Sequence, residues 1–275
     1  MRNGVSRPGR AVPSNLTFLA VVATLALSAA LAAQATQAPP APRKAPADTA
    51  AALPSARAIV DKFIEATGGR MAILSHKSTR VSGTMSIAGS GMSGAIEVLN
   101  AKPNLSLVRV TIPGIGEILD GFDGTTGWML SPVTGPMVYQ GKELADRKFD
   151  ADYYGDLHDP SRYSSMRTVE KMTFEGRPCY KVSLMRVGGG EDSEFYDVAT
   201  GLKAGSIMSR TTPMGEVSST TVLKDYRKFG DLLLPTVMSQ SSMGAKQDVT
   251  VTAVEYDKLP PSAFEAPAQI RALIK

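Results

Sequence analysis

The protein has 275 residues, of which 43% are hydrophobic and 20% charged, and a formal net charge of +4. This length allows one or two domains. Its single cysteine, Cys179, excludes an internal disulfide, and because it lies in an alternating apolar segment we interpret it as a buried structural thiol.

The first 35 residues have the order of a secretory signal peptide. Three arginines precede an almost purely apolar segment, residues 16–33, and Ala33-Gln34-Ala35 offers small residues at the positions that a signal peptidase reads. We therefore predict a signal peptide over 1–35 and a periplasmic or other extracytoplasmic location. The alternative is a retained N-terminal membrane anchor, because the apolar segment approaches the roughly 18 residues that a membrane span needs.

Removal of this signal peptide changes the charge balance. It takes away three arginines and no acid, so the net charge falls from +4 to +1. The basic character of the whole chain is therefore no sign of nucleic-acid binding, and no stripe of basic and aromatic residues indicates it either. Residues 36–53, rich in Ala and Pro, are expected to be a disordered linker, which leaves 54–275 as the folded domain.

The folded domain is expected to begin with an amphipathic helix. Ser55 is a suitable N-cap, and Gly68-Gly69 would end the helix. Ile59, Phe63 and Ile64 fall on one face, while charged residues face away from it. The helix is therefore predicted to lie on an apolar surface.

After residue 75 the apolar period changes from about four to two. Val81, Met85 and Ile87 alternate with polar residues, and segments 96–98 and 108–112 alternate in the same way. Turns rich in Gly, Pro and Asn separate these segments about every ten residues, which favours an antiparallel barrel or sandwich over a parallel sheet. Each strand is expected to have one dry face and one wet face.

Residues 116–139 continue the strands around a sharp turn. Asp123-Gly124 favours this turn, because glycine takes positive φ without steric cost and Asp can bond to nearby backbone. The only tryptophan, Trp128, follows the turn. We interpret it as an anchor of the core, with the lining of a pocket as the alternative, and expect the segment to bend around an apolar interior.

A second amphipathic helix is predicted over residues 141–154, because apolar residues that include Phe149 and Tyr153 recur there at helical spacing. Seven further strands are predicted over 166–174, 179–187, 194–197, 206–211, 217–226, 233–240 and 248–256. The tail is expected to pack Phe264 onto the domain and to end in a short helix from Ala268.

Several short segments, in this order along the chain, resemble the LolA-type periplasmic lipoprotein carriers, and more closely their relatives named outer-membrane lipoprotein-sorting proteins. The segments are residues 66–69 (ATGG), 122–128 (FDGTTGW), 174–180 (FEGRPCY), 194–202 (EFYDVATGL), 225–227 (DYR), Leu234-Pro235 and Leu259-Pro260 leading to Phe264. The resemblance implies an incomplete, strongly curved antiparallel barrel whose apolar concave face is covered by helices and holds acyl chains. It assigns no contact residue by position.

We therefore predict an α+β fold, a curved and incomplete antiparallel β-barrel of about 11 to 13 strands with a helical lid over an apolar concave face. The residues expected to form this wall and lid, and to contact a ligand, are Val81, Met85, Ile96, Val98, Val108, Val110, Trp128, Phe149 and Tyr153. Methionine is frequent on the predicted strands, and both a deformable lipid pocket and an ordinary core would accommodate it.

No catalytic residue, metal or cofactor is predicted. Residues 150–161 match a calcium loop at its first, third and sixth positions, but Tyr154 and Ser161 occupy two further ligand positions, which favours a solvated helix end. Asp156 and His158 lie near several serines, but no G-x-S-x-G segment places a serine on a strained turn. A hydrolase is therefore the third hypothesis.

The leading hypothesis is an exported, non-enzymatic carrier or binding protein for acyl chains, either the lipid anchor of a lipoprotein or another lipid. Its expected partners are those acyl chains and an envelope protein, with transient contact to a membrane surface, no nucleic acid and a monomeric state. The alternative is an envelope sensor or protein-interaction module with the same fold and a core filled by its own side chains.

Overall fold

The computed structural model describes residues 52–212 and 214–274. The predicted signal peptide, residues 1–35, lies outside the described residues, as does the predicted linker except for residues 52 and 53. Within the described part of the chain, no helix is both long and apolar enough to cross a membrane.

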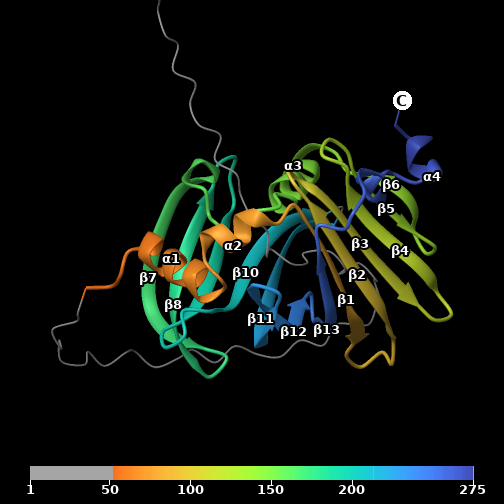
Figure 1. The fold of residues 1–275 in the computed structure, drawn as a ribbon. Coiled ribbons are helices and arrows are strands. Elements are labelled where there is room, and N and C mark those ends of the chain that lie inside the picture. The colour runs from red at the N-terminus through yellow and green to blue at the C-terminus, as the bar shows by residue number, and fades with distance from the viewer. Residues whose placement is uncertain (1–51, 213, 275) are drawn as a thin grey trace, which may run out of the picture.

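Thirteen antiparallel strands form one sheet that curves around a hollow without closing (Figure 1). The strands are β1 (Ser78–Ile87), β2 (Ser93–Ala101), β3 (Leu105–Ile112), β4 (Gly116–Phe122), β5 (Gly127–Ser131), β6 (Gly135–Val138), β7 (Tyr163–Phe174), β8 (Arg177–Arg186), β9 (Glu191–Asp197), β10 (Lys203–Thr212), β11 (Gly215–Phe229), β12 (Leu232–Ser242) and β13 (Ala245–Tyr256). The predicted fold class, an incomplete antiparallel barrel of 11 to 13 strands with a helical lid, is confirmed.

The sheet consists of two meanders that meet at one junction. Strands β1 to β6 pair consecutively, β7 to β13 pair consecutively, and β1 pairs with β13. The edges of the sheet are therefore β6 and β7, which follow each other in the chain. Their connection, residues 139–162, crosses the hollow and carries α3 (Gly141–Asp150) (Figure 1).

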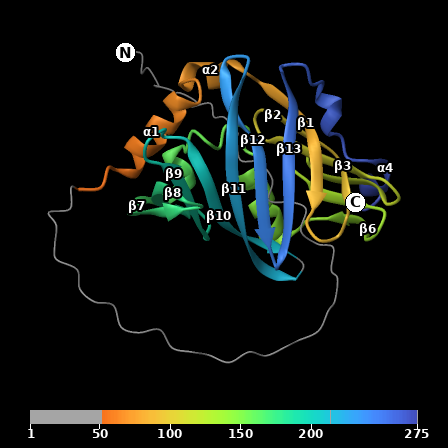
Figure 2. The same cartoon turned by 90° about the horizontal axis from the view of Figure 1, so that it is seen from below.

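Helices α1 (Ala56–Ala66) and α3 cover parts of the inner face of the sheet. Helix α1 lies across β7 and β8, and α2 (Arg70–Ser75) follows it (Figures 1 and 2). The Ser55 hydroxyl accepts a hydrogen bond from the Ala58 N–H at 3.2 Å, which confirms this residue as the N-cap. Two 3-10 turns, Pro160–Arg162 and Pro261–Phe264, and α4 (Ala268–Arg271) complete the elements.

The second predicted helix is shorter than expected. It ends at Asp150, and the N–H of Tyr153 bonds the carbonyl of Pro103, in the turn between β2 and β3, at 3.0 Å instead of continuing the helical ladder. Tyr153 consequently lies in the connection after α3. Helix α2 was not expected at all, since residues 70–75 carry no helical repeat long enough to show a period.

Two apolar clusters occupy the concave side. The first lies under α1, where Ile59 and Phe63 pack on Val182, Leu184 and Tyr196 of the sheet. The second joins β1, β2 and β3 to β11, β12 and β13. The curvature of the sheet thus allows its own inner face to pack against itself.

The convex side carries a third cluster and a row of charges. Leu99, Leu107 and Trp128 pack beneath Phe264 and Ile270 of the C-terminal segment. On the same face, exposed ion pairs link residues of adjacent strands: they are Arg80, Glu97, Arg109 and Glu117. The convex side is therefore solvated along this row of charges and covered where the tail packs on it.

Candidate functional site

A cavity of about 330 Å³ lies between α3 and the concave face of the sheet. Its apolar walls are Met129, Met137, Tyr139, Met214 and Val217. Its charged lining residues are Glu143, Asp146, Arg147, Asp150 and Arg210, and its other polar lining residues are Thr134, Thr211, Thr212, Ser219, Gln240 and Ser242. The volume is at the lower end of the roughly 300–1,000 Å³ typical of small-molecule sites, and most of the exposed lining is apolar.

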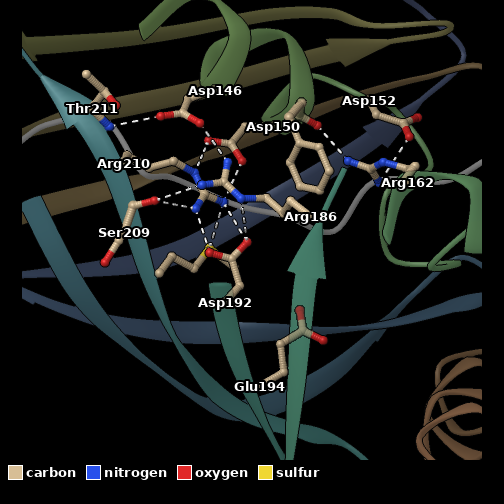
Figure 3. Close-up of polar contacts among 12 residues, drawn as sticks. Asp146, Asp150, Asp152, Arg162, Arg186, Asp192, Glu194, Ser209, Arg210 and Thr211 are labelled. Carbon is tan, nitrogen blue, oxygen red and sulfur yellow. Dashed lines mark hydrogen bonds and ion pairs between the residues drawn. The ribbon is translucent and has the colours of Figure 1, made fainter. Parts of the chain in front are cut away.

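One side of the cavity is built by a buried ion network (Figure 3). Arg210 of β10 reaches Asp150 at 2.8 Å and Asp192 of β9 at 2.7 Å. Arg186 of β8 reaches Asp146 at 2.7 Å. Both arginines thus lie between the carboxylates of α3 and the carboxylate of β9, and the network fixes α3 over the sheet.

A second group of side chains connects α3 to β4. The Tyr139 hydroxyl donates to the Asp120 carboxylate at 2.5 Å, and Arg147 donates to the same carboxylate at 2.9 Å. Burial raises the pKa of Asp120 to about 6, although the charge of Arg147 and the bond from Tyr139 lower it in part. The same burial raises the pKa of the Tyr139 hydroxyl, so this group is a neutral donor.

The carboxylates around the cavity differ in their surroundings. Burial raises the pKa of Glu143, and burial also raises the pKa of Asp192 despite the neighbouring Arg210. For Asp146, burial acts in the same direction but is outweighed by bonds from the Thr211 N–H and Arg186, so its pKa is lowered. Glu143 makes no hydrogen bond to another described residue, whereas Asp146 accepts several.

A separate ion group lies below the first, beneath α1. Lys203 bonds Asp156 at 2.6 Å and Glu194 at 2.8 Å, and all three side chains are almost fully buried. His158 Nε2 lies 2.7 Å from Glu194, and the Tyr196 hydroxyl donates to the same carboxylate. These cationic partners outweigh the effect of burial and lower the pKa of Glu194. The group joins the connection after α3 to β9 and β10.

Comparison with solved structures shows which known folds are similar to this architecture. A DUF1329 family protein from Desulfovibrio piger matches with a TM-score of 0.55 at 14% identity, over 76% of this chain and 97% of its own. A LolA superfamily protein from Nitrosomonas europaea matches with a TM-score of 0.52 at 14% identity, over 78% of this chain and 99% of its own. The chain has a LolA-like fold.

An outer-membrane lipoprotein-sorting protein domain from Vibrio parahaemolyticus matches the same architecture, with a TM-score of 0.51 at 10% identity over 76% of this chain and 95% of its own. Neither a protein-family model nor a curated protein sequence matches the chain. The predicted LolA-like resemblance is therefore confirmed at the level of the fold.

Six of the predicted wall residues lie together on the concave face of this LolA-like sheet. They are Val81, Met85, Ile96, Val98, Val108 and Val110, each no more than 6% exposed. They pack against one another and against Leu223, Met238 and Val249. The cavity beneath α3 is lined by other residues, so a contact of these six with a ligand stays a prediction.

The two predicted lid residues lie in different surroundings. Tyr153 belongs to the cluster under α1 and shares a 2.8 Å hydrogen bond with Thr79. Phe149, near the end of α3, packs edge-on against Tyr163 and lies under the guanidinium of Arg162. Neither residue lines the cavity beneath α3, and their contact with a ligand stays a prediction too.

The placement of Trp128 on the concave wall is wrong. Trp128 pairs with Gly121, which pairs with Leu107, and these positions face the convex side beneath the C-terminal segment. The concave positions of the same strands are Asp120 and Met129, one residue away. A period-two pattern places the tryptophan on one of two faces but does not say which face is concave.

The structure also corrects the interpretation of residues 150–161 as a solvated helix end. Asp156 and His158 are 2% and 1% exposed, and their partners come from β9 and β10. The charged residues that line the cavity and were missed from the sequence are those of α3. Glu143, Asp146, Arg147 and Asp150 recur at helical spacing and face the sheet, a charged stripe where an apolar one was expected.

Proposed function

We propose that this protein is an exported, non-enzymatic carrier or binding protein that shelters acyl chains in the cell envelope. The observation that carries the proposal is the cavity beneath α3, whose walls include Met129, Met137, Met214 and Val217. Thioether side chains adapt to irregular apolar shapes, which suits a flexible hydrocarbon chain. Each methylene group buried there would contribute about 0.8 kcal/mol to binding.

Two further observations support the proposal. The solved structures with this fold include one described as an outer-membrane lipoprotein-sorting domain, and the N-terminal sequence predicts export. The cavity also lies between a helix and the concave face of the sheet, and the ionic contacts of α3 hold that helix over it.

Native mass spectrometry of protein purified without detergent tests the proposal, together with thermal shifts on adding fatty alcohols, fatty acids or lipopeptides. We expect bound lipid and a rise in the melting temperature. Ser219→Trp should fill the cavity and abolish both signals. Ser218→Trp is the matched control, because Ser218 is the exposed neighbour on the opposite face of the same strand and should leave binding intact.

A second candidate function rests on the packing of the six predicted wall residues. Because they are nearly inaccessible and contact one another, the apolar cluster that joins β1, β2 and β3 to β11, β12 and β13 is filled by the protein's own side chains. This favours a sensor or protein-interaction module of the envelope. It predicts a stoichiometric protein partner in pull-downs from the envelope fraction and no bound lipid, whereas the carrier predicts the reverse.

A further inference from the structure

We propose that the cavity beneath α3 selects an acyl ligand whose polar end carries no negative charge and donates hydrogen bonds to Glu143. This inference rests on the proposed function and adds to it the chemical class of the ligand. It follows from the charges that surround the cavity and from the way in which those charges are already paired.

The cations at the cavity are already neutralised by the protein. Arg147 donates to Asp120 at 2.9 Å, Arg186 to Asp146 at 2.7 Å, and Arg210 to Asp150 and Asp192 at 2.8 and 2.7 Å. These contacts are buried or nearly so, and breaking one leaves a buried carboxylate without its partner. Displacing a carboxylate from such a pair costs several kcal/mol, so an anionic ligand would find no available guanidinium.

The cavity region carries more carboxylates than cations. Its carboxyl groups are Asp120, Glu143, Asp146, Asp150 and Asp192, and its guanidinium groups are Arg147, Arg186 and Arg210, five against three. Lys142 is bonded to Asp146 at 3.2 Å, but its side chain is half exposed on the outer side of α3. The described residues therefore give the interior an excess of negative charge, which repels an incoming carboxylate or phosphate.

Glu143 is the carboxylate that remains available. It lines the cavity together with Met129, Met137 and Val217, and it accepts no hydrogen bond from another described residue. Glu143 is partly buried at the cavity wall, so a hydroxyl, amide or ammonium group on the ligand would donate to the acceptor that the protein leaves open. The apolar walls then hold the chain and Glu143 holds the polar end.

Isothermal titration at pH 8 with three probes of equal chain length tests this assignment: dodecanoate, 1-monododecanoylglycerol and dodecylammonium, each below its micellar concentration. We expect the glycerol ester and the ammonium to bind at least about tenfold more tightly than dodecanoate, as one desolvated like-charge contact implies. Glu143→Gln should bring dodecanoate to within about threefold of the ester, and Glu143→Lys should reverse the preference. Glu170→Gln, at an exposed position of β7, is the control and should change nothing.

The outcomes separate this inference from the proposed function. Equal binding of dodecanoate and the ester to the unmodified protein would overturn the selectivity while supporting the carrier. A preference for the ester that Glu143→Gln leaves unchanged would overturn the assignment of Glu143. Failure of all three probes to bind would instead overturn the carrier proposal itself. Circular dichroism of each variant confirms that a lost preference does not come from unfolding.

Discussion

The concave face of the sheet is stabilised in two different ways in its two halves. Where β1, β2 and β3 approach β11, β12 and β13, the side chains are apolar and pack against one another. Where α3 covers β8, β9 and β10, the contacts are ion pairs buried between Asp146, Asp150, Asp192, Arg186 and Arg210. The inner surface of the sheet is thus apolar in one half and lined by paired charges in the other.

The two regions resist change for different physical reasons. Apolar packing depends on shape, and each lost methylene group leaves a void that the surroundings fill only in part. Buried ion pairs gain little net free energy relative to apolar replacements, but they are costly to break one partner at a time. The first region can therefore serve as a fixed frame, while the second defines which arrangement of α3 is allowed and borders the cavity.

The largest expected effect comes from removing one cation of the network. Arg210→Met leaves Asp150 and Asp192 without their common partner, and we expect the free energy of unfolding to fall by about 3–5 kcal/mol. Urea denaturation measures it. A loss below about 1 kcal/mol would mean that water reaches these carboxylates and that the two halves do not differ as described.

The apolar half has its own test. Met85 is 1% exposed within the cluster of β1 to β3 and β11 to β13, and Met85→Ala should lower the free energy of unfolding by about 2–5 kcal/mol. Because Met85 does not line the cavity beneath α3, the affinity for the glycerol ester should stay within about twofold. A large loss of affinity for the glycerol ester would instead indicate that the ligand contacts the cluster of the six predicted wall residues.

The buried carboxylate of Asp120, which bonds Arg147 of α3, should make the stability of the protein depend on pH. Burial raises the folded-state pKa of Asp120 from 3.8 to about 6, so the folded protein holds this proton more tightly than the unfolded chain does. The resulting stabilisation is complete below about pH 4 and is lost as the pH rises through 6, a change of about 3 kcal/mol. Asp120→Asn removes the titrating group. Urea midpoints from pH 4 to 7 should therefore fall more steeply for the unmodified protein than for this variant.

The smallest change in the free energy of unfolding is expected for an arginine that, like Arg210, pairs with two carboxylates but lies on the convex face. Arg109 bonds Glu97 at 2.9 Å and Glu117 at 3.1 Å on the convex face, but its side chain is 37% exposed. Arg109→Met should change the free energy of unfolding by less than about 1 kcal/mol. A cost similar to that of Arg210→Met would show that the number of ion pairs, rather than their burial, determines the loss.

The strands could be predicted from the sequence because their signals are local. Alternation around Val81, Met85 and Ile96 and the glycine turns between segments indicate where the strands lie, and the predicted 11 to 13 antiparallel strands include the thirteen observed. The helix after Ser55 was equally clear, since its cap and its apolar face lie within one segment. The choice of face for Trp128 was not local, because the curvature of the sheet decides it.

The ion network could not be predicted for the same reason. Charged residues at helical spacing, such as Asp146 and Asp150, ordinarily indicate a solvated face, and their partners Arg186 and Arg210 lie on strands far along the chain. One signal was present: Asp192, Glu194 and Tyr196 alternate in β9 and place two acids on the face that carries a buried tyrosine. Only the pairing of β8, β9 and β10 shows that cations meet them there.

The pairing of β1 with β13 has a consequence for how the chain folds. Each meander grows by closing short hairpins, which costs little chain entropy, whereas this junction brings together residues such as Val81 and Val254 from opposite ends of the domain. Contacts so distant in sequence form slowly. We therefore expect the two meanders to assemble separately and to join late, so that synthesis of the chain must reach β13 before the hollow can form.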